Sequence, residues 1–230
     1  LLGQLLDALD ETGLADETTV VAFSDHGDWA GDYGLVEKWP SGLDDCLTRV
    51  PLIIRTPGGV QGHVVEEPVE CFDIMPTTLE LAGVEAQHTH AARSLVPQLH
   101  GATGDPDRAV FAEGGYDLHE PHCFEGRPED GVCGNPNSIY YPKGIQQQEH
   151  PESVCRSAMI RTESHKLIRR TNGQHELYDL SVDPDELNNV YGLPDHLKAE
   201  RDLEQQLLDW YVGTSDVTPW VPDPRGFPEY

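Results

Sequence analysis

Lysine is scarce in this chain, which has only four lysines among 230 residues. Lysine and arginine together number 15 against 41 aspartates and glutamates, so the formal net charge is −26 at pH 7. Because so little positive charge is available to neutralise phosphates, nucleic acid is excluded as a partner. The acidic, lysine-poor surface favours a halophilic protein, since 1 M salt screens repulsion beyond about 3 Å; an ordinary acidic protein is the alternative.

Long apolar runs are also absent. No run approaches the roughly 20 residues that a membrane-spanning helix needs, so no membrane span is expected. Hydrophobic residues still make up 37% of the chain, enough for the core of one large or two modest domains. No signal peptide is visible, although one would be lost with a missing amino-terminal segment. The compartment stays open, with the cytoplasm slightly favoured.

Cysteine is limited to five residues and forms no Cys-x-x-Cys motif. The odd number favours reduced thiols over a disulfide framework. Cys123 and Cys133 bracket a segment rich in glycine and proline and are the one pair that spacing leaves open to a disulfide.

The segment Ser24–Asp28 follows a short β-branched and apolar run at residues 18–23, which predicts a strand buried on both faces. Asp25 and His26 then lie at the carboxyl edge of that strand, where open α/β sheets place their ligand sites. A carboxylate and an imidazole are both ligands for a divalent cation. Lys38 returns a positive charge to the same edge, which suits an anionic substrate. The alternative is a simple turn in which Asp25 bonds its own backbone.

The first half of the chain has the alternation of a parallel α/β sheet. A leucine-rich helix ends at Gly13, and strands follow at 18–23 and 50–55. Asp73 is predicted to cap a helix that runs to Gly83.

The second half of the chain has a different pattern of predicted elements. Short strand-like runs at 108–113, 156–161, 165–170 and 175–180 are close together, so the last three are predicted to pair antiparallel. Asn172-Gly173 is a hairpin signal. The segment from Asp183 to Glu186 has the form of a capped helix start, and Pro194 is expected to open a final helix.

Residues 114–154 form a predicted loop that is too long to be a mere connection. Loops on a rigid scaffold usually carry specificity, so it is interpreted as a substrate-facing lid. A disordered or interface loop is the alternative. His119, His122 and Cys123 could also be read as a zinc site, but no second ligand pair matches them.

Six blocks along the chain resemble, in order, those of the sulfatase family of the alkaline-phosphatase superfamily. They cover most of the 230 residues, and it is the series rather than any one block that is specific. The blocks are Ser24–Asp28 with Lys38, Arg49–Ile54, Asp73–Gly83, Ser94–Gly101, Ile160–Ile168 and Glu176–Glu186.

The resemblance implies an α/β fold: part of a mixed, mainly parallel sheet sandwiched by helices, alkaline-phosphatase-like, with a small carboxyl-terminal antiparallel sheet and a packed helix. It divides the chain into residues 1–105, from the catalytic α/β domain, and 106–230, a subdomain with the long loop.

The implied activity is metal-dependent hydrolysis of sulfate esters on a small molecule or saccharide. By resemblance, Asp25 and His26 would hold Ca²⁺, and Lys38 would be catalytic and bind a sulfate oxygen. His119 and His122 are candidate substrate contacts. Alternatives are a phosphonate monoester hydrolase or phosphodiesterase using Mn²⁺ or Zn²⁺, and a non-catalytic acidic metal-binding domain. The oligomeric state stays open.

The chain departs from the family in one respect. No Cys-x-Pro-x-Arg or Ser-x-Pro-x-Arg, which would supply the nucleophile, occurs in the 24 residues before Asp25. None of the five cysteines begins such a motif. The chain is therefore expected to be the carboxyl-terminal part of a longer enzyme and to be inactive by itself.

Overall fold

The computed structural model describes residues 1–117 and 135–216. It divides the chain into two compact units, each discontinuous in sequence. The first contains Leu1–Asp25, Val50–Val110 and the stretch from Leu208, and the second contains His26–Arg49 and Phe111–Leu207. The predicted domain division at residue 105 stays a prediction.

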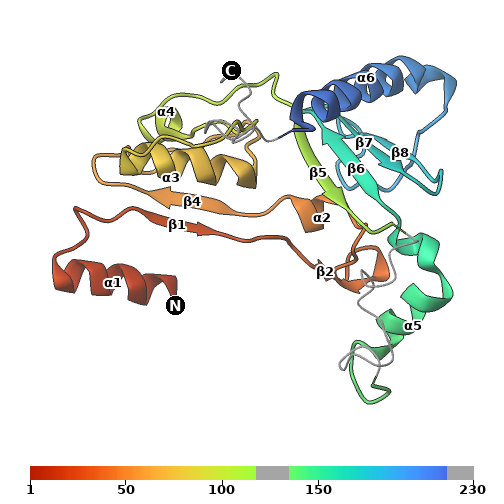
Figure 1. Ribbon diagram of the computed structural model, residues 1–230, viewed down its shortest axis with the longest axis horizontal. Helices are drawn as coiled ribbons and strands as arrows, with labels where there is room; N and C mark the ends of the chain where they lie inside the picture. Colours follow the sequence, from red (N-terminus) through yellow and green to blue (C-terminus); the bar gives the residue numbers. More distant parts are fainter. Residues whose placement is uncertain (118–134, 217–230) are drawn as a thin grey trace, which may run out of the picture. The chain divides into compact units, whose positions relative to one another are not determined.

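The first unit contains a two-stranded ribbon with helices (Figure 1). Its elements are α1 (Leu2–Thr12), β1 (Val20–Phe23), β4 (Leu52–Arg55), η2 (Cys71–Asp73), α3 (Ile74–Ala82) and α4 (Val96–Leu99). Two helix ends match the sequence prediction, because Gly13 and Gly83 adopt the left-handed conformation that terminates α1 and α3.

The pairing of β1 with β4 differs from the parallel arrangement that the alternation predicted. The two strands are antiparallel, with Val21 opposite Ile54. A parallel pair requires a crossover connection, usually a helix of several turns. In the described chain between these strands, the only α-helix is the four-residue α2 (Asp45–Thr48), which is too short for such a crossover. The prediction of a parallel arrangement is therefore wrong for β1 and β4.

The prediction that residues 18–23 are buried on both faces is also wrong for this chain. Phe23 is 51% exposed, and Ile53 on the paired strand is 61% exposed. Within the described residues this sheet has two strands, so much of its apolar surface faces outward.

Asp73 does not act as the predicted side-chain cap of α3. Its buried carboxylate accepts hydrogen bonds from Arg108 at 2.6 and 3.0 Å and from the backbone N–H groups of Glu70 and Arg93. Arg108 also forms an ion pair with Glu70 at 2.8 Å. The Asp73 carboxylate therefore binds the Arg108 guanidinium instead of capping α3, because a buried carboxylate needs a charged partner.

The second unit is built around a four-stranded sheet in the order β5-β6-β7-β8 (Figure 1). The strands are β5 (Val110–Gly114), β6 (Ser157–Arg161), β7 (His165–Arg170) and β8 (Glu176–Asp179). The other elements are β2 (Trp29–Ala30), η1 (Asp32–Gly34), β3 (Val36–Glu37), α2, α5 (Tyr141–Glu149), η3 (Pro151–Val154), η4 (Pro194–His196) and the part of α6 (Leu197–Thr214) up to Leu207.

The predicted antiparallel pairing of the last three strands is confirmed. Both faces of this sheet carry buried side chains. Ile160, Leu167 and Leu177 lie opposite one another in register and are fully buried. The next row, on the other face, includes Met159 and Ile168. Met159 and Ile168 pack in one cluster with Leu43, Tyr178 and Leu180. Because Leu43 comes just before α2, this segment lies against the same face of the sheet.

Helix α6 begins after Pro194, as predicted, and lies beside the sheet (Figure 1). Leu203 and Leu207 are buried, and Glu204 forms an ion pair with Arg169 of β7. The helix thus covers the sheet through a leucine stripe flanked by a charged contact.

Two predictions for the second unit are wrong. Residues 114–154 were expected to form a loop but contain α5 and η3. The sequence did not predict α5, because this helix includes proline and glycine and has little apolar periodicity. The segment from Asp183 to Glu186 starts no helix. The Asp183 carboxylate instead accepts backbone hydrogen bonds from Leu187 and Asn188, which closes a turn.

Candidate functional site

The predicted site residues begin where β1 ends. Asp25 belongs to the first unit, and its carboxylate lies close enough to Cys71 to affect that thiol. Burial, Asp73 and Asp25, in descending order, raise the pKa of Cys71. Asp25 is thus a negative centre at the strand end, where the sequence placed it.

The next two site residues, His26 and Lys38, meet within the second unit. Nζ of Lys38 lies 2.8 Å from Nε2 of His26, and Nδ1 of His26 lies 2.9 Å from the carbonyl oxygen of Gly27. An ammonium group can only donate, so Nε2 accepts and carries a lone pair. The proton of the neutral ring is then on Nδ1 and is donated to Gly27. The structure therefore places the Lys38 ammonium group beside the His26 imidazole, whose proton is on Nδ1.

The chain between these two residues is a short hairpin of β2 and β3, in which Trp29 lies opposite Glu37. Gly31 and Gly34 have positive φ at its turn. Glu37 also has positive φ, at 69°, which is unusual for a residue with a side chain. This backbone turn comes directly before Lys38 and sets the direction in which the chain presents it.

The loop that carries the two residues is anchored at several points of the second unit. The Trp39 indole and the Ser41 hydroxyl both donate to the carbonyl oxygen of Ser153, each at 2.7 Å. The carbonyl oxygen of Pro40 accepts from the backbone of Gly115 at 2.7 Å. The three residues that follow Lys38 are therefore fixed by strong hydrogen bonds.

A second set of anchors holds α2, the other end of the loop. Lys166 is fully buried on β7, and its Nζ lies 3.0 Å from Asp45 and 2.8 Å from Glu186. Arg161 adds an ion pair with Asp45 at 3.1 Å. We call these four residues the Lys166 cluster.

Burial and charge act in opposite directions within the Lys166 cluster. Burial raises the pKa of Glu186 to about 7, and the attraction of Lys166 offsets this only in part. Burial also raises the pKa of Asp45, but Lys166 and Arg161 outweigh it and hold that pKa below its ordinary value. Asp45 is therefore the charged partner of Lys166 throughout the neutral range.

Gly27 connects α2 to the site. Its backbone N–H donates to the carbonyl oxygen of Leu47 at 2.8 Å. A Cβ atom added at Gly27 would lie 2.0 Å from the backbone oxygen of Cys46, far inside van der Waals contact. Only glycine allows this approach, and so the position of His26 depends on the position of α2.

Gly27→Ala should therefore displace His26, and any turnover to which His26 contributes should fall by roughly tenfold or more, because small displacements of reacting groups are costly. The measurement is kcat together with the melting temperature. Gly3→Ala is the matched control, since Gly3 lies in α1 with open space around its Cβ position. Equal kcat for both variants would show that the close packing at Gly27 does not position the site.

His119 and His122, the predicted substrate contacts, lie outside the described residues, as do Cys123 and Cys133. The cysteines for which the structure gives a state, Cys46, Cys71 and Cys155, are free. No helix in the described ranges is long and apolar enough to cross a membrane.

Sequence reasoning missed the Lys166 cluster and a second group, formed by His165, Asp179 and His196. Asp45 and Lys166 are 121 positions apart, and no local pattern joins them. The available signal was Lys166 next to the apolar pair Leu167 and Ile168 in a strand-like run, because a lysine at a buried strand position indicates a partner of opposite charge.

Two family models match the chain. One, described as sulfatase, matches residues 1–84, and the other, described as the carboxyl-terminal part of N-sulphoglucosamine sulphohydrolase, matches residues 135–212. The second match covers most of the second unit's sheet and α6.

Individual proteins give a consistent picture. The chain is 32% identical over 221 residues to an N-acetylglucosamine-6-O-sulfatase of Bacteroides thetaiotaomicron, covering 95% of this chain and 34% of that protein. It is 29% identical, with a TM-score of 0.72, to the phosphonate monoester hydrolase of Silicibacter pomeroyi, covering 93% of this chain and 38% of that one.

A third similarity is to a protein solved in complex with its substrate D-glucosamine-2-N,6-O-disulfate, with 28% identity and a TM-score of 0.68, over 91% of this chain and 37% of that one. These likenesses agree with the alkaline-phosphatase-like fold that the sequence predicted. The chain spans little more than a third of the length of the curated relatives it matches.

Proposed function

Because the chain belongs to the sulfatase family of the alkaline-phosphatase superfamily, we propose that it contributes half of an active site that hydrolyses sulfate esters. The observation that carries the proposal is the contact between Lys38 and His26, at 2.8 Å, in a loop whose residues directly after Lys38 are anchored by hydrogen bonds. The substrate class is a sulfated small molecule or saccharide, in line with the substrate named for one similar structure.

Lys38 has the role of binding a sulfate oxygen. Its ammonium group is a compact positive charge in a protein of net charge −26, so it offers an anionic group a local centre of attraction. Charge that develops on the sulfate oxygens and the leaving group is stabilised by such a donor when it is held in place beforehand. The anchors at Trp39 and Ser41 hold the backbone beside it.

Asp25 and His26 are the residues that would hold a divalent cation. The tautomer fits this role, because Nδ1 of His26 faces the Gly27 carbonyl and the lone pair is on Nε2. Lys38 engages the same lone pair, so the ammonium group and a cation would compete for it. A bound cation would supply Lewis-acid chemistry. Ca²⁺ prefers oxygen ligands, and the imidazole suits Mn²⁺ or Zn²⁺ at least as well.

The Asp25 carboxylate with the His26 imidazole, and the likeness to a phosphonate monoester hydrolase, favour a second candidate function: hydrolysis of phosphonate monoesters or phosphodiesters. A comparison of sulfate monoesters, phosphonate monoesters and phosphodiesters of one common phenol separates the two activities. The full-length protein should have its highest kcat/KM on the sulfate ester, and removal of divalent cations by a chelator should abolish turnover.

A preference for the phosphonate ester would replace the first candidate by the second. The third alternative, a non-catalytic acidic domain that binds metal, predicts no turnover of any of the three esters although cations bind. Each outcome thus selects one of the three functions.

A further inference from the structure

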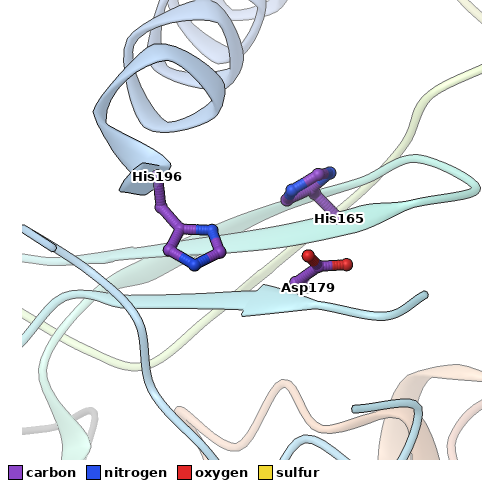
Figure 2. A group of neighbouring side chains, drawn as sticks. All are labelled: His165, Asp179 and His196. Carbon is purple, nitrogen blue, oxygen red and sulfur yellow. The ribbon is translucent and has the colours of Figure 1, made fainter. Parts of the chain in front are cut away.

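We propose that His165, Asp179 and His196 form a binding site for a zinc-class divalent cation, separate from Asp25 and His26. Figure 2 shows the three side chains converging from two strands and the start of a helix. One potential ligand atom of each residue lies within 4.8 Å of those of the other two. All three residues belong to the second unit.

The backbone brings the three side chains together. His165, the first residue of β7, lies directly opposite Asp179, the last residue of β8, so both side chains leave the same face of the sheet. His196 ends η4, immediately before α6, and its backbone N–H donates to the carbonyl oxygen of Leu193 at 3.0 Å. The site therefore rests on regular elements, which place ligands more precisely than loops do.

Neighbouring groups orient two of the three ligands. Nδ1 of His165 lies 2.9 Å from the Ser164 hydroxyl, and when Nδ1–H donates to that oxygen the lone pair on Nε2 is the one that a metal takes. The Asp179 carboxylate accepts a hydrogen bond from the backbone N–H of Ser181 at 3.1 Å. The Ser181 hydroxyl donates to the same carboxylate oxygen at 2.5 Å.

The chemistry of this set selects the cation. Two imidazoles and one carboxylate suit Zn²⁺ and its transition-metal neighbours, whereas Ca²⁺ and Mg²⁺ prefer oxygen. Tetrahedral zinc with bonds of about 2.0–2.1 Å places its ligand atoms about 3.4 Å apart. The observed limit of 4.8 Å therefore requires a contraction of about 1.4 Å at most, which side-chain rotation supplies. All three residues are partly exposed, so a cation can enter and keep a water molecule as its fourth ligand.

A cation bound here would tie the start of α6 to the ends of β7 and β8. Its binding energy would add to the stability of the folded protein by mass action, because the three ligands are 14 and 17 residues apart in sequence and are gathered only by folding.

The test uses the full-length protein in a His26→Ala background, so that the proposed active-site imidazole does not contribute. After removal of metal, Co²⁺ is added and its visible absorption is recorded, and Zn²⁺ binding is measured by calorimetry. We expect one equivalent of bound Zn²⁺, a visible band from Co²⁺ in a tetrahedral site, and a melting temperature that rises with Zn²⁺.

His165→Ala, Asp179→Asn and His196→Ala should each weaken Zn²⁺ binding by more than about tenfold and remove the shift in melting temperature. His150→Ala is the matched control, because His150 is an exposed histidine outside the cluster and should change nothing. Comparing melting temperatures without metal separates misfolding from loss of a ligand. Identical isotherms for His196→Ala and His150→Ala, or no Zn²⁺ binding before mutation, would overturn the proposal. The outcome is independent of sulfate ester hydrolysis, because no substrate is present.

Discussion

Lys38→Ala should lower kcat of the full-length protein on a sulfate monoester by about 10²–10³, the usual cost of removing one well-placed electrostatic contact to the transition state. The reason is the position of Nζ, 2.8 Å from His26, in a loop whose backbone is fixed independently of the lysine side chain. Folding should be unaffected, because no buried carboxylate is left without a partner when Lys38 is removed. The measurement is kcat with a thermal melt of the same sample.

The matched control is Lys198→Ala, which removes the same charge from an exposed position on α6, where the side chain is 90% exposed. An exposed ion pair such as that of Lys198 with Asp202 contributes little, so kcat and melting temperature should both remain unchanged. If Lys38→Ala retained full activity, the lysine would be a surface charge. If it lost its melting transition, the lysine would be structural, and the proposed role would fail in either case.

Lys166→Met should destabilise the protein by about 3–5 kcal/mol, since it leaves the buried Glu186 without its charged partner and removes one of the two cations that pair with Asp45. Lys166 is fully buried and contacts both Asp45 and Glu186. Methionine keeps the length and apolar character of the lysine stem, so the loss comes from charge rather than from a cavity. Chemical denaturation, with the free energy of unfolding at zero denaturant, measures the effect.

The pH dependence of the variants distinguishes the two carboxylates. The pKa of Glu186 is raised by burial from 4.5 to about 7 in the folded protein. The stabilisation that its protonation gives is fully present below pH 4.5 and is lost as the pH rises to about 7. Glu186→Gln lacks this loss, so it should gain stability relative to the parent protein between pH 5 and pH 8.

The cost of Lys166→Met should change with pH for the same reason. At pH 5 Glu186 is protonated and Asp45 still pairs with Arg161, so the variant leaves no buried carboxylate charge without a partner, and the loss should be smaller than at pH 8. An equal loss at both pH values would show that Glu186 keeps its charge, and a loss below about 1 kcal/mol would show that the cluster is solvated.

Local patterns predicted the elements whose structure is set by their own residues. The leucine stripe with Gly13 predicted α1, and the closely spaced strand-like runs predicted the antiparallel pairing of β6, β7 and β8. The interval from His26 to Lys38 was long enough for a return of the chain, and the β2–β3 hairpin provides it. In each case hydrophobic periodicity and turn residues act over a few positions, which a single sequence records.

The errors arise where distant residues compete with a local pattern. Asp73 has the form of a helix cap, but Arg108, 35 positions later, binds its carboxylate. The turn from Asp183 to Glu186 resembles a helix start, but Glu186 adopts positive φ, and its side chain pairs with buried Lys166. A charged partner far along the chain outweighs a capping preference of about 1 kcal/mol. The same limit hid the His165, Asp179 and His196 group, whose members belong to three separate elements.

The hairpin that carries the site is made of two-residue strands, which have almost no rigidity of their own. It is held instead by hydrogen bonds to Ser153 of η3 and to Gly115, which follows β5, and through α2 by the buried Lys166 of β7. Mechanical support and chemical identity are thus encoded by different residues. Substitutions in the turn between Ala30 and Val36 should therefore leave these supporting contacts intact, whereas loss of the Lys166 contacts should loosen the loop that carries the hairpin.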